Sequence, residues 1–179
     1  MSTWIVAMDG VDRRLLLRLA TLRHPVLTLL FRTLTRVADP VPMALLGALL
    51  LVGAFPLPEG VAGRGAALSL ALAFGASQLL KRRISRPRPV LPVGFASLAR
   101  APDHFSFPSG HSAGALAVVL PVAGDLMAEG RVALAAICVV PALLVGVSRS
   151  YLGVHYPGDV VAGWALAIMA ALVTHMVLP

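Results

Sequence analysis

The pattern of hydrophobic and polar positions divides the chain into a first part rich in arginine and a series of uncharged apolar runs. The runs cover residues 41–57, 65–80, 112–124, 132–147 and 160–178. Each run can cross a bilayer once flanking residues are included, and the third must then extend over about 109–127. The pattern therefore predicts about five transmembrane helices.

Residues 11–37 follow a different pattern, in which leucines are mixed with Arg13, Arg14, Arg18, Arg23, Arg32 and Arg36. An arginine near the bilayer centre costs about 2.5 kcal/mol or more, whereas an amphipathic helix in the interface keeps its charges among the headgroups. We expect such an in-plane helix, broken near Pro25. The predicted fold class is all-α: a polytopic membrane helical bundle in one domain, 1–179, with an interfacial segment over 1–40 and a helical core over 41–179.

The composition excludes a soluble globular domain and a disordered chain. Hydrophobic residues make up 58% of the sequence and charged residues 13%, with a mean hydropathy of +0.87. The 15 basic residues outnumber the 8 acidic ones, but they are not interleaved with aromatics, so we expect membrane lipids and not nucleic acid as partners. Cys138, the single cysteine, is expected to serve core packing.

Five spans place three polar segments on one face of the membrane: the N-terminal segment, the 81–108 loop and the 148–159 connection. Arg64 and Arg131 are the two basic residues on the opposite face, and the other thirteen lie on the first. Cytoplasmic loops of membrane proteins are rich in Lys and Arg. The sequence therefore predicts a multi-pass cell-membrane protein whose polar clusters lie at the cytoplasmic interface.

The first cluster follows the second apolar run. Pro87 and Pro89 end the helix there, which leaves Lys81 and Arg88 as cations at the mouth of a span. Lys81 is the only lysine in the chain, and a compact point charge suits a phosphate. The other basic residues of the cluster, Arg82, Arg83 and Arg86, are expected to anchor the helix end in the headgroups.

The second cluster, Pro108–His111, opens an apolar helix. The Ser109 hydroxyl and the free amides of a helix N-terminus can hold an anion, and Gly110 allows close approach of the backbone. A Ser-Gly pair at a helix start is also a common cap. His111 in the first turn favours the chemical interpretation, because an imidazole beside a bound anion can donate a proton.

The third cluster contains Arg149, His155 and Asp159 in the connection before the last run. Arginine offers a planar fork to phosphate oxygens. Asp159 lies four residues after His155, so we expect its carboxylate to hold one imidazole nitrogen one helical turn away and leave the other free as a nucleophile. Asp159 is the one carboxylate within the clusters, so neither a metal site nor another cofactor is expected. His104, in the long loop, is expected to be solvated.

Together the clusters resemble the three-part signature of the type 2 phosphatidic acid phosphatase superfamily: Lys81 with Arg88-Pro89, Pro108–His111, and Ser148-Arg149 with His155 and Asp159. The resemblance covers about residues 65–178. It implies a metal-independent lipid phosphatase that works through a phosphohistidine on His155. Asp159 then orients His155, and His111 protonates the leaving oxygen. Phosphate is held by Lys81, Arg88, Ser109, Gly110 and Arg149.

Two other functions fit parts of the sequence. The same superfamily contains vanadate-dependent haloperoxidases, but those relatives are soluble. A non-catalytic anion-binding or transport protein would need charged or broken helices at mid-bilayer, and the apolar runs carry no charge. The expected substrate is phosphatidate, phosphatidylglycerophosphate or a polyprenyl phosphate or diphosphate, and the sequence specifies neither which of these nor an oligomeric state.

Overall fold

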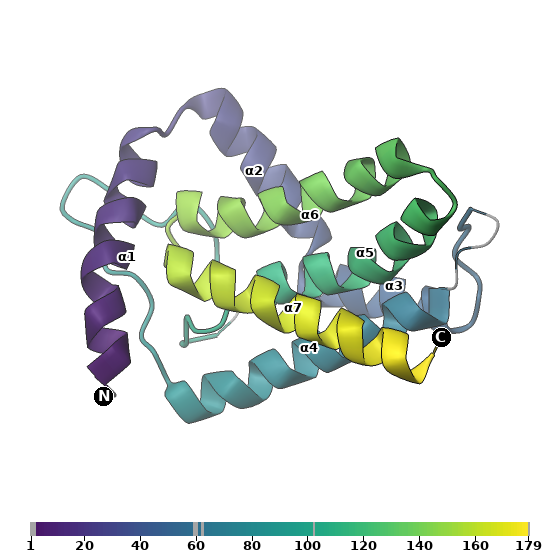
Figure 1. Ribbon diagram of the computed structural model, residues 1–179. Helices are drawn as coiled ribbons and strands as arrows, with labels where there is room; N and C mark the ends of the chain where they lie inside the picture. The colour runs from purple at the N-terminus through teal and green to yellow at the C-terminus, as the bar shows by residue number, and fades with distance from the viewer. Residues whose placement is uncertain (1–2, 59–60, 62, 102, 179) are drawn as a thin grey trace.

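The computed structural model describes residues 3–58, 61, 63–101 and 103–178, and this part of the chain folds into seven α-helices joined by loops (Figure 1). Their bounds are α1 Thr3–Thr21, α2 Pro25–Val37, α3 Pro40–Leu51, α4 Gly63–Ile84, α5 Gly110–Ala128, α6 Val132–Tyr151 and α7 Pro157–Val177. The predicted all-α class is confirmed.

Helix α5 lies at the centre of the bundle and packs against α4, α6 and α7. Its buried positions are mostly small, as in the run from Ala113 to Ala117. Small side chains let helix backbones approach closely. Such packing favours helix association in lipid, where the hydrophobic effect does not drive helices together. The ends of α4 and α6 and the start of α7 lie at the same end of the bundle as the N-terminus of α5 (Figure 1).

Prolines set where three of the helices begin. Pro25, Pro40 and Pro157 each occupy the first turn of a helix, and the residues before them, His24, Asp39 and Tyr156, are extended. Proline disfavours the helical conformation in the preceding residue, while its own fixed φ suits a helix start. The expected break near Pro25 is confirmed, since α1 ends at Thr21.

The predicted span over 41–57 is wrong in extent. Helix α3 has 12 residues and measures about 18 Å, which is short of a hydrocarbon core of about 30 Å. It ends in a turn through Gly53 at φ 70°. Helices α2 and α3 meet at a bend of 47° and together are long and apolar enough for one broken span. Part of the predicted interfacial segment thus belongs to this bent pair.

Three helices, α5, α6 and α7, can each cross a membrane by length and composition, and the bent pair raises the number to four. Helix α4 has the length, with 22 residues, but its last turn carries Lys81, Arg82 and Arg83. By length and composition the described helices thus supply three or four of the about five predicted spans. The outer faces of α6 and α7 expose large apolar side chains suited to lipid, among them Ile137, Val140, Leu144, Val161, Ile168, Met169, Leu172 and Val173.

Helix α1 lies across one end of the bundle, beside the start of α7 and the end of α6 (Figure 1). The loop between α4 and α5 covers the same end. This is where α4 and α6 finish and α5 and α7 begin, so the polar residues at these four helix ends are brought close to one another.

Candidate active site

All three sequence clusters meet at this end of the bundle. Lys81 lies in the last turn of α4, Ser109 caps α5, and Asp159 lies in the first turn of α7. Arg149 was expected in a connecting loop, but α6 continues through Tyr151 and places it in the last helical turn. The polar residues after Val147 stay helical because their side chains turn into the buried site and not into lipid.

His155 is almost fully buried, and its two ring nitrogens have different surroundings. A guanidinium N–H of Arg88 donates to Nε2 at 3.1 Å, and Nδ1 lies 3.6 Å from Asp159 Oδ2. Arginine can only donate, so Nε2 is the acceptor and Nδ1 carries the proton. Burial, followed by the charges of Arg149, Arg88 and Lys81, holds the pKa of His155 well below its ordinary value. His155 is therefore neutral at pH 7, and the lone pair of its Nε2 lies near the cations Arg88, Arg149 and Lys81.

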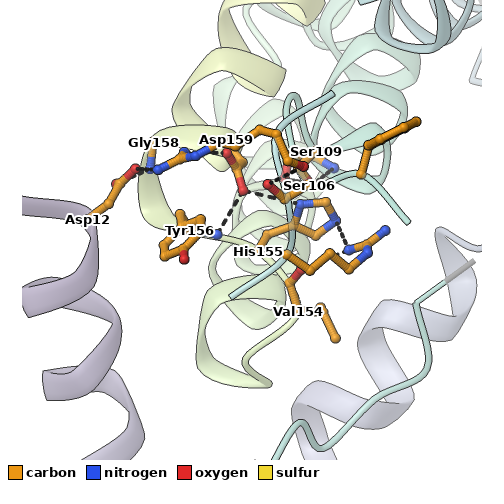
Figure 2. Close-up of polar contacts among 12 residues, drawn as sticks. Asp12, Ser106, Ser109, Val154, His155, Tyr156, Gly158 and Asp159 are labelled. Atoms are coloured by element: carbon orange, nitrogen blue, oxygen red, sulfur yellow. Dashed lines mark hydrogen bonds and ion pairs between the residues drawn. The ribbon is translucent and has the colours of Figure 1, made fainter. Parts of the chain in front are cut away.

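Asp159 lies in the first turn of α7, and hydrogen bonds fix both of its carboxylate oxygens. Its Oδ2 accepts the Tyr156 backbone N–H at 2.8 Å, and its Oδ1 accepts an Arg86 N–H at 2.7 Å. The expectation that His155 and Asp159 share a helical turn is wrong. Because Pro157 forces Tyr156 into an extended conformation, the helix begins after His155. The loop nevertheless turns His155 back toward the carboxylate (Figure 2).

Arg149 is a buried cation with unsatisfied N–H donors. It is 1% exposed, and one of its guanidinium nitrogens donates to Thr35 Oγ1 at 2.8 Å. Its Nε and Nη2 have no hydrogen-bond partner among the described residues. A buried guanidinium costs free energy unless its charge and donors are satisfied. An anion with several acceptor oxygens, such as a phosphoryl group, fits this position.

Lys81 and Arg88 share a carboxylate that the sequence analysis did not identify. Lys81 Nζ lies 2.6 Å from Asp103 Oδ2, and Arg88 Nη2 lies 2.7 Å from Asp103 Oδ1. Burial alone would raise the pKa of Asp103, but the hydrogen bonds and charges of Lys81 and Arg88 outweigh it and lower the pKa. Asp103 is the only acidic residue of the 81–108 loop, which is the one signal that could have singled it out.

The start of α5 is fixed to the start of α7. The Ser109 N–H donates to the Asp159 carbonyl at 2.9 Å, and the Ser109 hydroxyl accepts from the Ser112 hydroxyl at 2.8 Å. A Cβ on Gly163 would lie 2.6 Å from the Ser109 carbonyl oxygen, whereas a Cβ on Gly110 would meet nothing closer than 3.6 Å. Of these two glycines, Gly163 is the one that packing requires. Gly110 lines a pocket that Lys81, Asp103 and His111 also line.

His111 has a carboxylate partner from outside the three clusters. Its Nε2 lies 2.8 Å from Asp39 Oδ1, at the bend between α2 and α3. Asp39 is not distinguished in the sequence, because it precedes a proline and therefore has the features of a helix cap. This contact brings the N-terminal part of the chain to the candidate proton donor.

The interpretation of Arg86 as a headgroup anchor is wrong. Arg82 and Arg83 are exposed, but Arg86 is 4% exposed and lies within 2.8 Å of carboxylates of both Asp12 and Asp159. Its guanidinium also stacks on the Tyr156 ring, 4.2 Å from the ring centroid. Helix α4 ends at Ile84 and Ser85 follows at φ 50°, a change of direction before Arg86 that the hydropathy pattern alone does not reveal.

The site also contains more carboxylates than the single Asp159 that the sequence analysis counted, since Asp39 and Asp103 contact its residues. Among the described residues, no group of three or more His, Cys, Asp or Glu side chains is arranged to hold a metal ion. His104 is exposed in the loop, as expected.

Comparison with known proteins assigns the family. The sequence model of the PAP2 superfamily matches residues 62–179, and the chain belongs to this superfamily. It is 38% identical to phosphatidylglycerophosphatase B of Bacillus subtilis over 57% of this chain and 53% of that protein. It is 37% identical to the decaprenylphosphoryl-5-phosphoribose phosphatase of Mycobacterium tuberculosis over 70% of this chain and 67% of that one. The chain thus spans about half to two thirds of these relatives' length.

Solved structures share the fold. The transmembrane PAP2-type phosphatidylglycerolphosphate phosphatase of Bacillus subtilis superposes with a TM-score of 0.80 at 28% identity, over 96% of this chain and 86% of that one. LpxE of Aquifex aeolicus gives a TM-score of 0.75 over 93% and 95% of the two chains, and at 24% identity it supports the fold alone. The fold is that of a PAP2 membrane protein.

Proposed function

We propose that this protein is an integral membrane phosphatase that hydrolyses a phosphomonoester or diphosphate of a membrane lipid. The observation that carries the proposal is the pairing of a neutral, buried His155 with the unsatisfied buried donors of Arg149. A neutral imidazole can attack phosphorus, and fixed cations stabilise the charge that develops on the equatorial oxygens.

In this mechanism Nε2 of His155 attacks the phosphoryl group while the bond to the lipid oxygen breaks. Arg88, which now contacts Nε2, moves its donors to the phosphoryl oxygens together with Lys81, Arg149, Ser109 and the amides at Gly110. His111 protonates the leaving oxygen and later takes a proton from the water that releases phosphate from His155. Asp159 stabilises the imidazolium that forms, as an orienting carboxylate does in other histidine-based sites.

A lipid tail has a path to this site. An apolar cavity of about 390 Å³ between α3 and α4 is lined by residues including Ala71, Met43 and Phe74. A second cavity of about 340 Å³ shares Met43 and Phe74 and reaches Lys81 and His111. The apolar cavity would hold the first part of an acyl or prenyl chain while the phosphate lies among the cations.

The relatives' names agree with such a substrate class. One acts on phosphatidylglycerophosphate and one on decaprenylphosphoryl-5-phosphoribose, and others are named undecaprenyl-diphosphatase, from Sulfolobus acidocaldarius, and lipid A 1-phosphatase, from Rhizobium johnstonii. The phosphate of a membrane lipid is common to all four. We propose one phosphatase domain over 1–179, in the cell membrane, with the site at the cytoplasmic interface and the first 40 residues lying largely along it.

Purified protein tests the reaction. Phosphate release from phosphatidate, phosphatidylglycerophosphate and polyprenyl diphosphate should be found for at least one substrate. His155→Ala should abolish it, and Asp159→Asn should lower it on the order of a thousandfold. Arg83→Gln, at an exposed arginine, is the control. Near-normal release by His155→Ala would exclude the mechanism, and oxidation of bromide by added hydrogen peroxide with vanadate bound would favour a haloperoxidase.

The tail path has its own test. Ala71→Phe places a ring in the apolar cavity and should raise KM for a long-chain lipid phosphate, while hydrolysis of water-soluble p-nitrophenyl phosphate is retained. Ala165→Phe, at an exposed position on α7, should leave both substrates unaffected. Equal loss on both substrates in Ala71→Phe would contradict the assignment of the cavity to the tail.

A further inference from the structure

Arg86 joins two carboxylates that come from opposite ends of the sequence. One guanidinium nitrogen donates to Asp159 Oδ1 at 2.7 Å and the other to Asp12 Oδ2 at 2.8 Å. Arg86 and Asp12 are each 4% exposed and Asp159 is fully buried. Buried ion pairs of this kind are held in one geometry, because breaking either contact leaves an uncompensated charge out of water.

Asp12 does more than neutralise Arg86. Its other oxygen, Oδ1, accepts the Gly158 backbone N–H at 2.7 Å, in the first turn of α7 (Figure 2). The carboxylate of Asp12 therefore fixes both the guanidinium that holds Asp159 and the helix turn that carries Asp159. Helix α1 is thereby connected to the nucleophile through a continuous series of contacts.

Asp159 is placed for its role only if these contacts hold. Its Oδ2 lies 3.6 Å from His155 Nδ1, so a small rotation of the carboxylate would decide whether it supports the imidazolium. With Oδ1 fixed by Arg86 and Oδ2 by the Tyr156 N–H, that rotation is blocked. The cation also helps keep a fully buried carboxylate ionised, since burial alone favours its neutral form.

We propose that Arg86 and Asp12 are positioning residues for phosphoryl transfer: Arg86 orients Asp159 toward His155, and Asp12 fixes Arg86. This inference rests on the proposed function. Asp12 lies outside residues 62–179, the part that the family model matches. The N-terminal helix is therefore needed for the rate of reaction and not only for attachment to the membrane.

Charge-removing variants of similar size test the inference. Arg86→Gln should lower kcat on the order of 10- to 100-fold, as misplacement of a catalytic group by about 1 Å does, and Asp12→Asn on the order of tenfold. KM and the inhibition constant of inorganic phosphate should stay within about twofold, because neither residue contacts the anion. Arg83→Gln and Arg13→Gln, at exposed neighbours, should keep wild-type kcat.

A double variant separates positioning from general damage. If Asp12 acts through Arg86, Asp12→Asn should cost less than about twofold in the Arg86→Gln background, because a shared contact is lost only once. If the two substitutions instead lower kcat by independent factors that multiply in the double variant, the proposal is overturned. Wild-type kcat in Arg86→Gln would also overturn it, as would a rise in KM that accounts for the whole effect.

Phosphate inhibition and gel filtration in detergent report whether each variant is folded. If Arg86→Gln fails these controls, Asp12→Asn, which keeps its size and an acceptor for Gly158, supplies the test alone. Its wild-type kcat would then overturn the proposal. The proposed function fails separately, if the wild-type protein releases no phosphate or if His155→Ala retains activity.

Discussion

Asp103 places a carboxylate where two cations of the site face each other. Lys81 and Arg88 both contact it, at 2.6 and 2.7 Å, and its side chain is 33% exposed. A phosphoryl group would need the same two cations. Asp103 therefore competes with the anion for Lys81 and Arg88, and its removal should strengthen anion binding.

We expect Asp103→Asn to lower the orthovanadate concentration needed for half inhibition by about two- to tenfold. The size is modest because partly exposed ion pairs contribute about 0.2–1 kcal/mol each. Glu129→Gln removes the same charge from an exposed pair with Arg131, 3.0 Å apart, and should change nothing. Weaker inhibition in Asp103→Asn would mean that the carboxylate holds the two cations in place for the anion.

His155 should remain the nucleophile at mildly acidic pH. Its pKa lies well below the ordinary 6.5 because of burial and of the charges of Arg149, Arg88 and Lys81. A lowered pKa keeps the imidazole unprotonated as the pH falls through 6.5, so kcat/KM should fall only at more acidic pH. In Arg88→Gln one of these charges is lost, and the acid limb should move to higher pH.

Titration of the substrate affects the pH profiles of wild-type protein and Arg88→Gln equally, because both are assayed with the same substrate. A difference between the two profiles therefore reports on the protein. His111 and Asp159 also face His155 and are present in both. An acid limb at the same pH in wild-type protein and Arg88→Gln would contradict the electrostatic explanation.

Spacing in the sequence identified the residues that the structure brings to one end of the bundle, since each cluster lies at a helix end that proline or a cap already defines. Their partners could not be predicted in this way. Asp12, Asp39 and Asp103 each meet a site residue more than 20 positions away. Such pairing depends on how α1, α2 and the long loop pack, and hydropathy does not encode it.

At the scale of elements, helix starts were predicted better than helix ends. Pro157 marks the start of α7, and the cap at Ser109 marks the start of α5. The apolar run that predicts α6 ends at Val147, but the helix continues through Tyr151, because the polar residues that suggest a loop belong to the site. The length of α3 was overestimated because an apolar run does not distinguish a helix from the Gly53 turn that follows it.

Close contact between α5 and α7 is required to bring Ser109 near Asp159. We expect Gly163→Ala to lower activity at least tenfold and to destabilise the protein by about 1–3 kcal/mol, because its Cβ would lie 2.6 Å from the Ser109 carbonyl and overpacking carries such costs. Gly75→Ala, with nothing within 4 Å of the added atom, is the matched control for thermal unfolding in detergent. Equal behaviour of the two variants would contradict the argument.

At the scale of the molecule, charge is concentrated at one end. The site, the α4–α5 loop and helix α1 lie together there (Figure 1). The basic residues apart from Arg64 and Arg131 belong to α1, to the α1–α2 turn and α2, to the α4–α5 loop, or to the last turns of α4 and α6. Lys81, Arg88 and Arg149 are the cations proposed to bind phosphate, but the remaining arginines at this end still outnumber those at the opposite end. The distribution favours a cytoplasmic site.

Sidedness can be measured with one introduced thiol. Ala101 is exposed in the α4–α5 loop and Glu129 in the turn at the opposite end. In a Cys138→Ala background, Ala101→Cys should resist a membrane-impermeant thiol reagent in intact cells and react after lysis. Glu129→Cys should react in intact cells. The reverse pattern would place the site on the outer face, where its substrate would be a lipid phosphate exposed outside the cell, and the basic residues would then serve headgroup and phosphate binding without setting the orientation.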